Sequence, residues 1–140
     1  MRKIAVVFWS GTGNTEIMAK AAADGAKEKG AEVTLFSPTE FDKEKVDEYN
    51  CIAFGCPAMG AEELEPEEFE PMFADLEGAL DGKNIALFGS YGWGDGQWMR
   101  EWEDRCRSAG AILVSGSVMA VETPDEKDLE ECRSMGAALV

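Results

Sequence analysis

Residues 10–15 (Ser-Gly-Thr-Gly-Asn-Thr) form the segment whose side chains are best suited to binding chemistry. Three hydroxyls and one amide offer hydrogen bonds, and two glycines permit a tight turn with close approach of the backbone. The segment separates an apolar run from a helical pattern, so the free N–H groups of a helix N-terminus would face the same point. These groups suit a phosphate, although an ordinary capped strand–helix turn would have a similar sequence. The residues expected around the phosphate are Ser10, Gly11, Thr12, Gly13, Asn14 and Thr15.

The same segment lacks the defining residues of two common nucleotide-binding motifs. A P-loop requires a lysine, and residues 10–15 contain none, which argues against hydrolysis of nucleoside triphosphates. A dinucleotide fingerprint requires a third glycine three residues after the second, but Glu16 stands at that position. The segment therefore favours a single terminal phosphate held by neutral donors.

Residues 90–96 place Tyr91 and Trp93 among three glycines. Aromatic side chains in such a loop bury little surface by themselves, but they make good walls for a flat ring. The alternative is a loop that packs on itself. The site residues expected in this loop are Ser90, Tyr91, Gly92, Trp93, Gly94 and Asp95.

Residues 56–65 form a third unusual loop. Met59 can cover the other face of a flat ring with its polarizable side chain, and Gly60 indicates a peptide with unusual dihedral angles. A run of glutamates begins at Glu62; it can be a solvated face, or it can oppose negative charge added to a bound ring. The site residues expected here are Pro57, Ala58, Met59, Gly60, Ala61 and Glu62.

The elements that must position these loops alternate between strand and helix patterns. Strands are predicted at residues 3–9, 32–36, 51–55 and 84–89 and within 111–121, from short apolar runs. Helices are predicted at 14–29, 66–76, 97–109 and 125–139, with one short helix within 37–50. This alternation predicts an α/β doubly wound sandwich: one domain, 1–140, with a five-stranded parallel sheet of order 2-1-3-4-5 and helices on both faces. The three loops then meet at the switch point of the sheet.

Charge and composition exclude several classes of protein. The net charge of −15 argues against binding to nucleic acid or to anionic membranes. The negative charge favours partners with basic faces; the alternative is that it serves only to keep the protein soluble. No apolar run is long enough to span a membrane, and no leader pattern follows Met1, so a cytoplasmic location is expected.

Cysteine spacing and the absence of histidine restrict the chemistry further. The four cysteines show no Cys-x-x-Cys spacing, and the sequence has no histidine, so we expect no metal site. Buried, reduced structural thiols are the expected state. The commonest general base is missing, so we expect no catalytic residue.

Taken together, these stretches resemble the flavodoxins, specifically the short-chain group. The matching segments are VVFWSGTGNTE (6–16), GCPAMG (55–60), EFEP (68–71) and LFGSYGWGDGQWM (87–99), and no long insertion is apparent in the fifth strand. The resemblance implies a non-enzymatic, low-potential one-electron carrier with non-covalently bound FMN. It also implies that the cofactor alternates between semiquinone and hydroquinone.

The resemblance also implies roles for particular residues. Residues 10–15 would hold the FMN phosphate, and the ring would lie between Met59 and Trp93. Tyr91, Gly92 and Gly94 would line the edge of the ring. Glu62 would accept a hydrogen bond from flavin N3–H, and the carbonyl of Gly60 would turn to accept a hydrogen bond from the N–H that forms at N5 on reduction.

Partners and alternatives follow from the same resemblance. The partners would be ferredoxin-dependent oxidoreductases, hydrogenases and flavoprotein reductases, and the protein would be a monomer. One alternative is an FMN-dependent quinone or nitro reductase, which would need space for a substrate beside a ring that Met59 and Trp93 are expected to cover. A receiver domain would need an acid at the end of the third strand, where the sequence has Phe54, Gly55 and Cys56.

Overall fold

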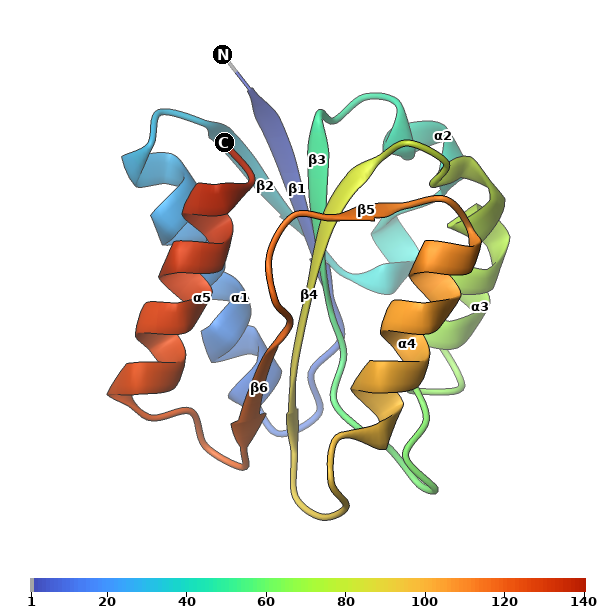
Figure 1. Ribbon diagram of the computed structural model, residues 1–140, viewed down its shortest axis with the longest axis vertical. Coiled ribbons are helices and arrows are strands. Elements are labelled where there is room, and N and C mark those ends of the chain that lie inside the picture. The colour runs from blue at the N-terminus through green and yellow to red at the C-terminus, as the bar shows by residue number, and fades with distance from the viewer. Residues whose placement is uncertain (1) are drawn as a thin grey trace.

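The apolar runs of the sequence form one parallel sheet, described for residues 2–140 by a computed structural model (Figure 1). The strands are β1 (Lys3–Phe8), β2 (Glu32–Phe36), β3 (Cys51–Gly55), β4 (Asn84–Tyr91), β5 (Ile112–Leu113) and β6 (Val118–Val121). Every residue of β3 is buried, because helices cover both faces of the sheet. The strand order is β2-β1-β3-β4-β5, and β6 also pairs with β4. This order confirms the predicted α/β doubly wound sandwich.

The fifth position in the sheet holds two short strands instead of one. The first pairs with the start of β4 through Asn84 and Ile112, and the second pairs with its end through Phe88 and Val118. Between these pairings, two residues of β4 lie opposite the four residues 114–117. Their sequence, Val-Ser-Gly-Ser, contains poor strand formers, so the chain bulges out of the sheet there.

Helices cover the sheet in two groups (Figure 1). One face packs against α1 (Asn14–Glu28) and α5 (Glu126–Ala138). The other packs against α2 (Lys43–Val46), α3 (Phe69–Leu76) and α4 (Gln97–Ser108). Two short 3-10 turns, Pro38–Glu40 and Glu77–Ala79, complete the second group. The segment 37–50 therefore holds a 3-10 turn as well as the short helix expected there.

The two faces differ in the size of their side chains. On the α3 and α4 face, Phe69, Phe73 and Trp102 make edge-on and stacked ring contacts. On the other face the core is rich in alanine, and α1 lies against α5 with glycines at the closest approach. A Cβ at Gly136 would overlap the carbonyl oxygen of Ala22. Small residues thus let two helices approach more closely than larger side chains would allow.

The start of α3 differs from the prediction, which placed it at Pro66. The helix begins at Phe69, and residues 66–68 form turns. The reason is the buried carboxylate of Glu65, which accepts hydrogen bonds from the N–H groups of residues 67, 68 and 69 and so caps the chain before the helix begins. The predicted ends of the other long helices agree with the structure within one residue.

Two further expectations concern thiols and membranes. All four cysteines are free and buried, which confirms the expectation of structural thiols. Burial raises the pKa of Cys106 and of Cys132 to about 12 in each case. Among residues 2–140, no helix has the length and apolar character needed to cross a membrane.

Candidate cofactor site

The loops that follow β1, β3 and β4 meet at the carboxyl end of the sheet, at the bottom of Figure 1. They enclose a cleft of about 270 Å³. Open parallel sheets bind ligands at this edge, where the strand order reverses. The residues that line the cleft are Trp9, Ser10, Gly11, Thr12, Asn14, Thr15, Pro57, Ala58, Met59, Ser90, Tyr91, Gly92 and Glu122.

The first loop, residues 10–15, is a tight turn that leads into α1. The Oγ of Ser10 accepts a hydrogen bond from the N–H of Gly13 at 3.0 Å. Gly13 has a φ of +98°, in the left-handed region that favours glycine. Within the described chain, Gly13 offers no side chain to cap α1, and the N–H of Asn14 has only a long contact of 3.5 Å with the Oγ1 of Thr12, so the first helical turn suits an anion.

A buried pair of hydroxyls joins the first loop to the end of β4. The Oγ1 of Thr15 and the Oγ of Ser90 lie 3.2 Å apart, and both side chains are buried. Residues far apart in the sequence are thereby fixed on one wall of the cleft. This contact could not be predicted from either loop alone.

The second loop, residues 56–65, turns back on itself as a small hairpin. The N–H of Met59 donates to the carbonyl of Glu63 at 2.8 Å, and the N–H of Glu63 donates to the carbonyl of Met59 at 2.9 Å. At the tip of this hairpin Gly60 has a φ of +50° and Glu62 a φ of +54°. A glutamate in this region is uncommon, so the tip holds backbone strain.

Glu62 contacts the third loop rather than the cleft. Its Oε1 accepts a hydrogen bond from the N–H of Gln97, the first residue of α4, at 3.1 Å. A Cβ at Gly94 would lie 2.6 Å from the same carboxylate, so only glycine allows this approach. Gly96, the residue preceding α4, has no side chain that could cap the helix, and Glu62 supplies the cap instead.

Several other expected site residues lie beside the cleft rather than on its lining. Trp93 is exposed, with 62% of its surface accessible. Asp95 forms an ion pair with Arg100 at 2.9 Å, and the hydrogen bond from this guanidinium lowers the pKa of Asp95. The expected residues outside the lining are Gly13, Gly60, Ala61, Glu62, Trp93, Gly94 and Asp95.

Two lining residues, Trp9 and Glu122, were not expected. The indole N–H of Trp9 donates to Glu68 at 3.0 Å and links the end of β1 to the turn before α3. Glu122 follows β6 directly and has a φ of +56°, while its N–H donates to the carbonyl of Tyr91 at 2.8 Å. The rule that places sites after parallel strands applies to β6 as well, and it would have indicated Glu122.

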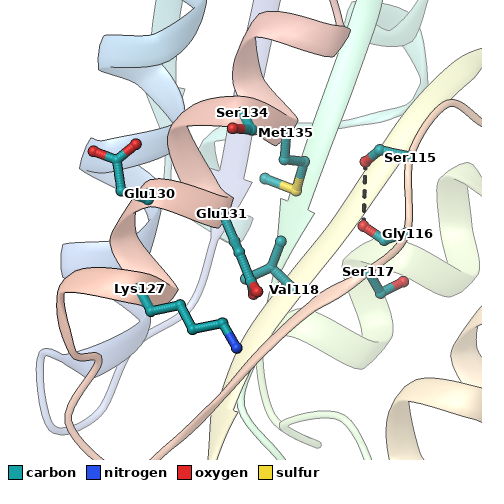
Figure 2. Close-up of a pocket in the computed structure, with 9 residues that line it drawn as sticks. All are labelled: Ser115, Gly116, Ser117, Val118, Lys127, Glu130, Glu131, Ser134 and Met135. Atoms are coloured by element: carbon teal, nitrogen blue, oxygen red, sulfur yellow. Dashed lines mark hydrogen bonds between the residues drawn. The ribbon is translucent and has the colours of Figure 1, made fainter.

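A larger groove, of about 490 Å³, lies between α5 and residues 115–118. Figure 2 shows Lys127 and Glu131 reaching from α5 toward Val118, while Glu130 points away. One lysine and two glutamates line it together with serines, so a bound anion would meet more negative than positive charge there. The smaller cleft is therefore the better candidate for a phosphorylated ligand.

The residues of the smaller cleft fit FMN. One end combines hydroxyls with the uncapped first turn of α1, which suits a phosphate dianion without a cation. The lining also includes the apolar or aromatic side chains of Met59, Tyr91 and Trp9, which suit a flat ring. Fold and cleft together define a doubly wound α/β protein that binds a phosphorylated ring at its switch point.

Comparison with known proteins identifies the family. A family model described as Flavodoxin matches residues 6–136. The flavodoxin of Clostridium beijerinckii is 40% identical over 131 residues, which is 94% of each chain. The solution structure of two-electron reduced Megasphaera elsdenii flavodoxin is 43% identical, covers 97% of each chain and has a TM-score of 0.90. A shorter match, to the NAD(P)H dehydrogenase (quinone) of Brucella ovis, is 52% identical but covers 33% of this chain and 23% of that protein.

The chain belongs to the flavodoxin family. Flavodoxins are electron carriers that bind FMN, and this chain is accordingly an FMN-binding electron carrier. Its length of 140 residues is consistent with the short-chain group.

Proposed function

We propose that this protein carries single electrons at low potential between larger redox proteins and catalyses no reaction of its own. The supporting observation is the make-up of the cleft: hydroxyls, apolar walls and one carboxylate. No histidine, lysine or cysteine stands among the lining residues of the described chain. Such a site can hold and tune a cofactor but offers no activated nucleophile.

The first loop would hold the cofactor through dipoles alone. Bound FMN supplies reversible one-electron transfer at its ring, and the protein supplies binding and tuning. Ser10, Thr12 and the first N–H groups of α1 would bind the phosphate. With a net charge of −15, neutral donors in a fixed turn are the means by which this chain can hold a dianion.

The second loop would respond to the redox state. The carbonyl of Gly60 can accept a hydrogen bond from a proton at N5 of the ring if its peptide rotates. A Cβ at Gly60 would meet its nearest neighbour, Glu63 Oε1, at 3.8 Å, so the tip has room to move. Glycine also keeps the cost of the rotated backbone low. Gly60 would in this way favour the addition of the first electron to the ring.

Acidic residues around the cleft would oppose the second electron. Glu122 lines the cleft, and Glu62 and Glu63 lie on the neighbouring hairpin. A ring that acquires negative charge would meet these carboxylates at short range in a site partly shielded from water. The second one-electron step would therefore occur at low potential. Glu62 accepts the N–H of Gln97 with its Oε1, and its second carboxylate oxygen would be the acceptor for N3–H of the ring.

Partners would recognise the protein through charge. An acidic carrier is attracted to basic faces, and ionic strength weakens that attraction. We propose ferredoxin-dependent oxidoreductases, hydrogenases and flavoprotein reductases as the partners, with a monomeric, one-domain carrier in the cytoplasm. An FMN-dependent quinone or nitro reductase is the less favoured alternative. The match to the NAD(P)H dehydrogenase (quinone) covers a third of the chain, whereas the match to flavodoxin spans nearly all of it.

Titration of the apoprotein with FMN, followed by anaerobic photoreduction, tests the proposal. We expect tight binding of one FMN and a blue one-electron-reduced form before full reduction. Failure of the apoprotein to bind FMN would contradict the function. Steady oxidation of NAD(P)H by the purified protein alone, with a quinone as acceptor, would instead support the enzymatic alternative.

A further inference from the structure

The base of the second loop is held by two residues that contact each other, Cys56 and Glu65. The N–H of Glu65 donates to the Sγ of Cys56 at 3.3 Å, which closes residues 57–64 into a loop with joined ends. Both residues are buried, Cys56 completely and Glu65 with 4% of its surface exposed. A buried contact between the two ends fixes where the loop leaves and rejoins the core.

Cys56 is itself fixed from the sheet and from α4. Its N–H donates to the carbonyl of Phe88 at 3.1 Å, and its carbonyl accepts from the indole N–H of Trp98 at 3.2 Å. A Cβ at Gly89 would overlap that same carbonyl, so β4 also packs against it without a gap. One end of the loop is therefore anchored to the central strands.

Glu65 is fixed by the turn that precedes α3. Its carboxylate accepts three backbone hydrogen bonds, from the N–H groups of Glu67 at 2.9 Å, Glu68 at 2.7 Å and Phe69 at 2.9 Å. Its own carbonyl accepts from the N–H of Glu70 at 2.9 Å. Hydrogen bonds to a charged acceptor are stronger than neutral ones, and burial shields them from water.

The tip of the loop contrasts with this base. Gly60 and Glu62 have positive φ, and Gly60 and Ala61 are exposed. A strained backbone at the tip, combined with a fixed base, would favour rotation of the peptide at Gly60 over displacement of the whole loop. A carbonyl that must meet an atom of the ring at hydrogen-bond distance depends on such a base for its position.

We propose that Glu65, clamped to Cys56 and to the turn before α3, is a positioning residue that holds the second loop so that the Gly60 carbonyl reaches the cofactor ring. This rests on the proposed function, in which that carbonyl accepts a hydrogen bond from the N–H at N5 of the ring. Glu65 is not among the residues that line the cofactor cleft, so it acts through the loop. A purely structural cap would affect folding but not the redox potentials.

The test compares Glu65→Ala with Glu65→Gln in FMN titrations and in measurements of both one-electron potentials. Glu65→Ala should weaken FMN binding about tenfold and should lower the potential of the first step, because the loop tip is no longer held. Glu65→Gln keeps an acceptor oxygen for Glu68 and Phe69 but presents an NH₂ group to Glu67, so it should change both quantities less.

Asp42→Ala is the matched control, because Asp42 caps α2 by accepting the N–H of Lys45 at 3.1 Å. This variant should lose stability without changing either potential. A charge effect would also be recognisable, since it would move the second step mainly and would be equal in Glu65→Ala and Glu65→Gln.

The positioning role alone would be overturned if Glu65→Ala had the potentials and FMN affinity of the wild type, provided that the wild type binds FMN and accepts two electrons in separate steps. Failure of the wild type to bind FMN would overturn the proposed function instead. If Glu65→Ala does not fold, Cys56→Ala removes the other end of the clamp and should also lower the first potential, by less. A first potential equal to that of the wild type in both Glu65→Gln and Cys56→Ala would then refute the proposal.

Discussion

The first and second loops of the cleft, residues 10–15 and 56–65, are built in opposite ways. In the first loop the turn itself is closed by local hydrogen bonds, from Gly13 to Ser10 and from Asn14 to Thr12, and the hydroxyl pair of Thr15 and Ser90 joins its end to β4. The second loop is held at its base by contacts with β4, α4 and the turn before α3, and its tip is strained. The difference suggests a division of labour, in which the local loop sets affinity and the tertiary loop sets the potentials.

The largest expected effect comes from placing a negative charge in the first loop. Thr12→Asp would set a carboxylate beside the phosphate, and like-charge repulsion in such a site costs several kcal/mol. We expect FMN affinity to fall about 100-fold or more, while riboflavin, which has no phosphate, binds as before. Fluorescence titration with both ligands measures this. Thr39→Asp, which adds the same charge outside the lining of the cleft, should leave both affinities unchanged, and an equal loss for riboflavin would mean that loop 10–15 does not hold the phosphate.

An intermediate effect is expected at the tip of the second loop. Valine at position 60 disfavours the positive φ of Gly60 and hinders rotation of its peptide. Gly60→Val should lower the potential of the first one-electron step by about 60 mV, equivalent to a tenfold change, and should leave oxidised FMN bound. Spectroelectrochemical titration gives both potentials.

Gly82 provides the control for this variant. It has a φ of +75° with no atom within 4 Å of an added Cβ, so Gly82→Val carries the same kind of backbone strain away from the cleft. Gly82→Val should lose stability with wild-type potentials. Identical potentials in Gly60→Val and the wild type would remove the redox role of the tip and with it the proposed division of labour.

The smallest expected effect is a difference in acid stability between the loops. Burial raises the pKa of Glu65, but the hydrogen bonds from Phe69, Glu68 and Glu67 outweigh it and bring the pKa below its ordinary value of 4.5. A group with a lowered pKa in the folded state stabilises the protein fully above its unfolded pKa, and this contribution is lost as the pH falls through the folded pKa. Residues 10–15 contain no titratable side chain and add nothing to this dependence.

Urea unfolding at a series of pH values below 5 measures the effect. The wild type should lose stability over this range faster than Glu65→Gln, whose amide does not titrate. Parallel curves for the two proteins would show that the carboxylate contributes nothing to the pH dependence. The loop base would then owe its stability to packing alone.

The predictability of each region follows from the range of its interactions. The strands and long helices were predictable because apolar periodicity and start and stop residues are local signals. The start of α3 was predicted three residues early because Pro66 is a usual first helical residue, whereas Glu65 caps from further back. The division of the fifth strand into β5 and β6 was not predicted. It arises because residues 114–117 number two more than the β4 residues opposite them, which shows only when the two strands are paired.

By itself, the sequence determined the fold class, the strand order and the absence of histidine chemistry, and it predicts that residues 10–15 bind a phosphate. These depend on local pattern, composition and the geometry that parallel strands impose. The tertiary structure alone decided that Glu62 caps α4 and that Cys56 and Glu65 clamp the second loop. Those contacts join segments brought together by packing, and in an acidic chain with many similar glutamates no local signal distinguishes the carboxylate that caps a helix from those that face water.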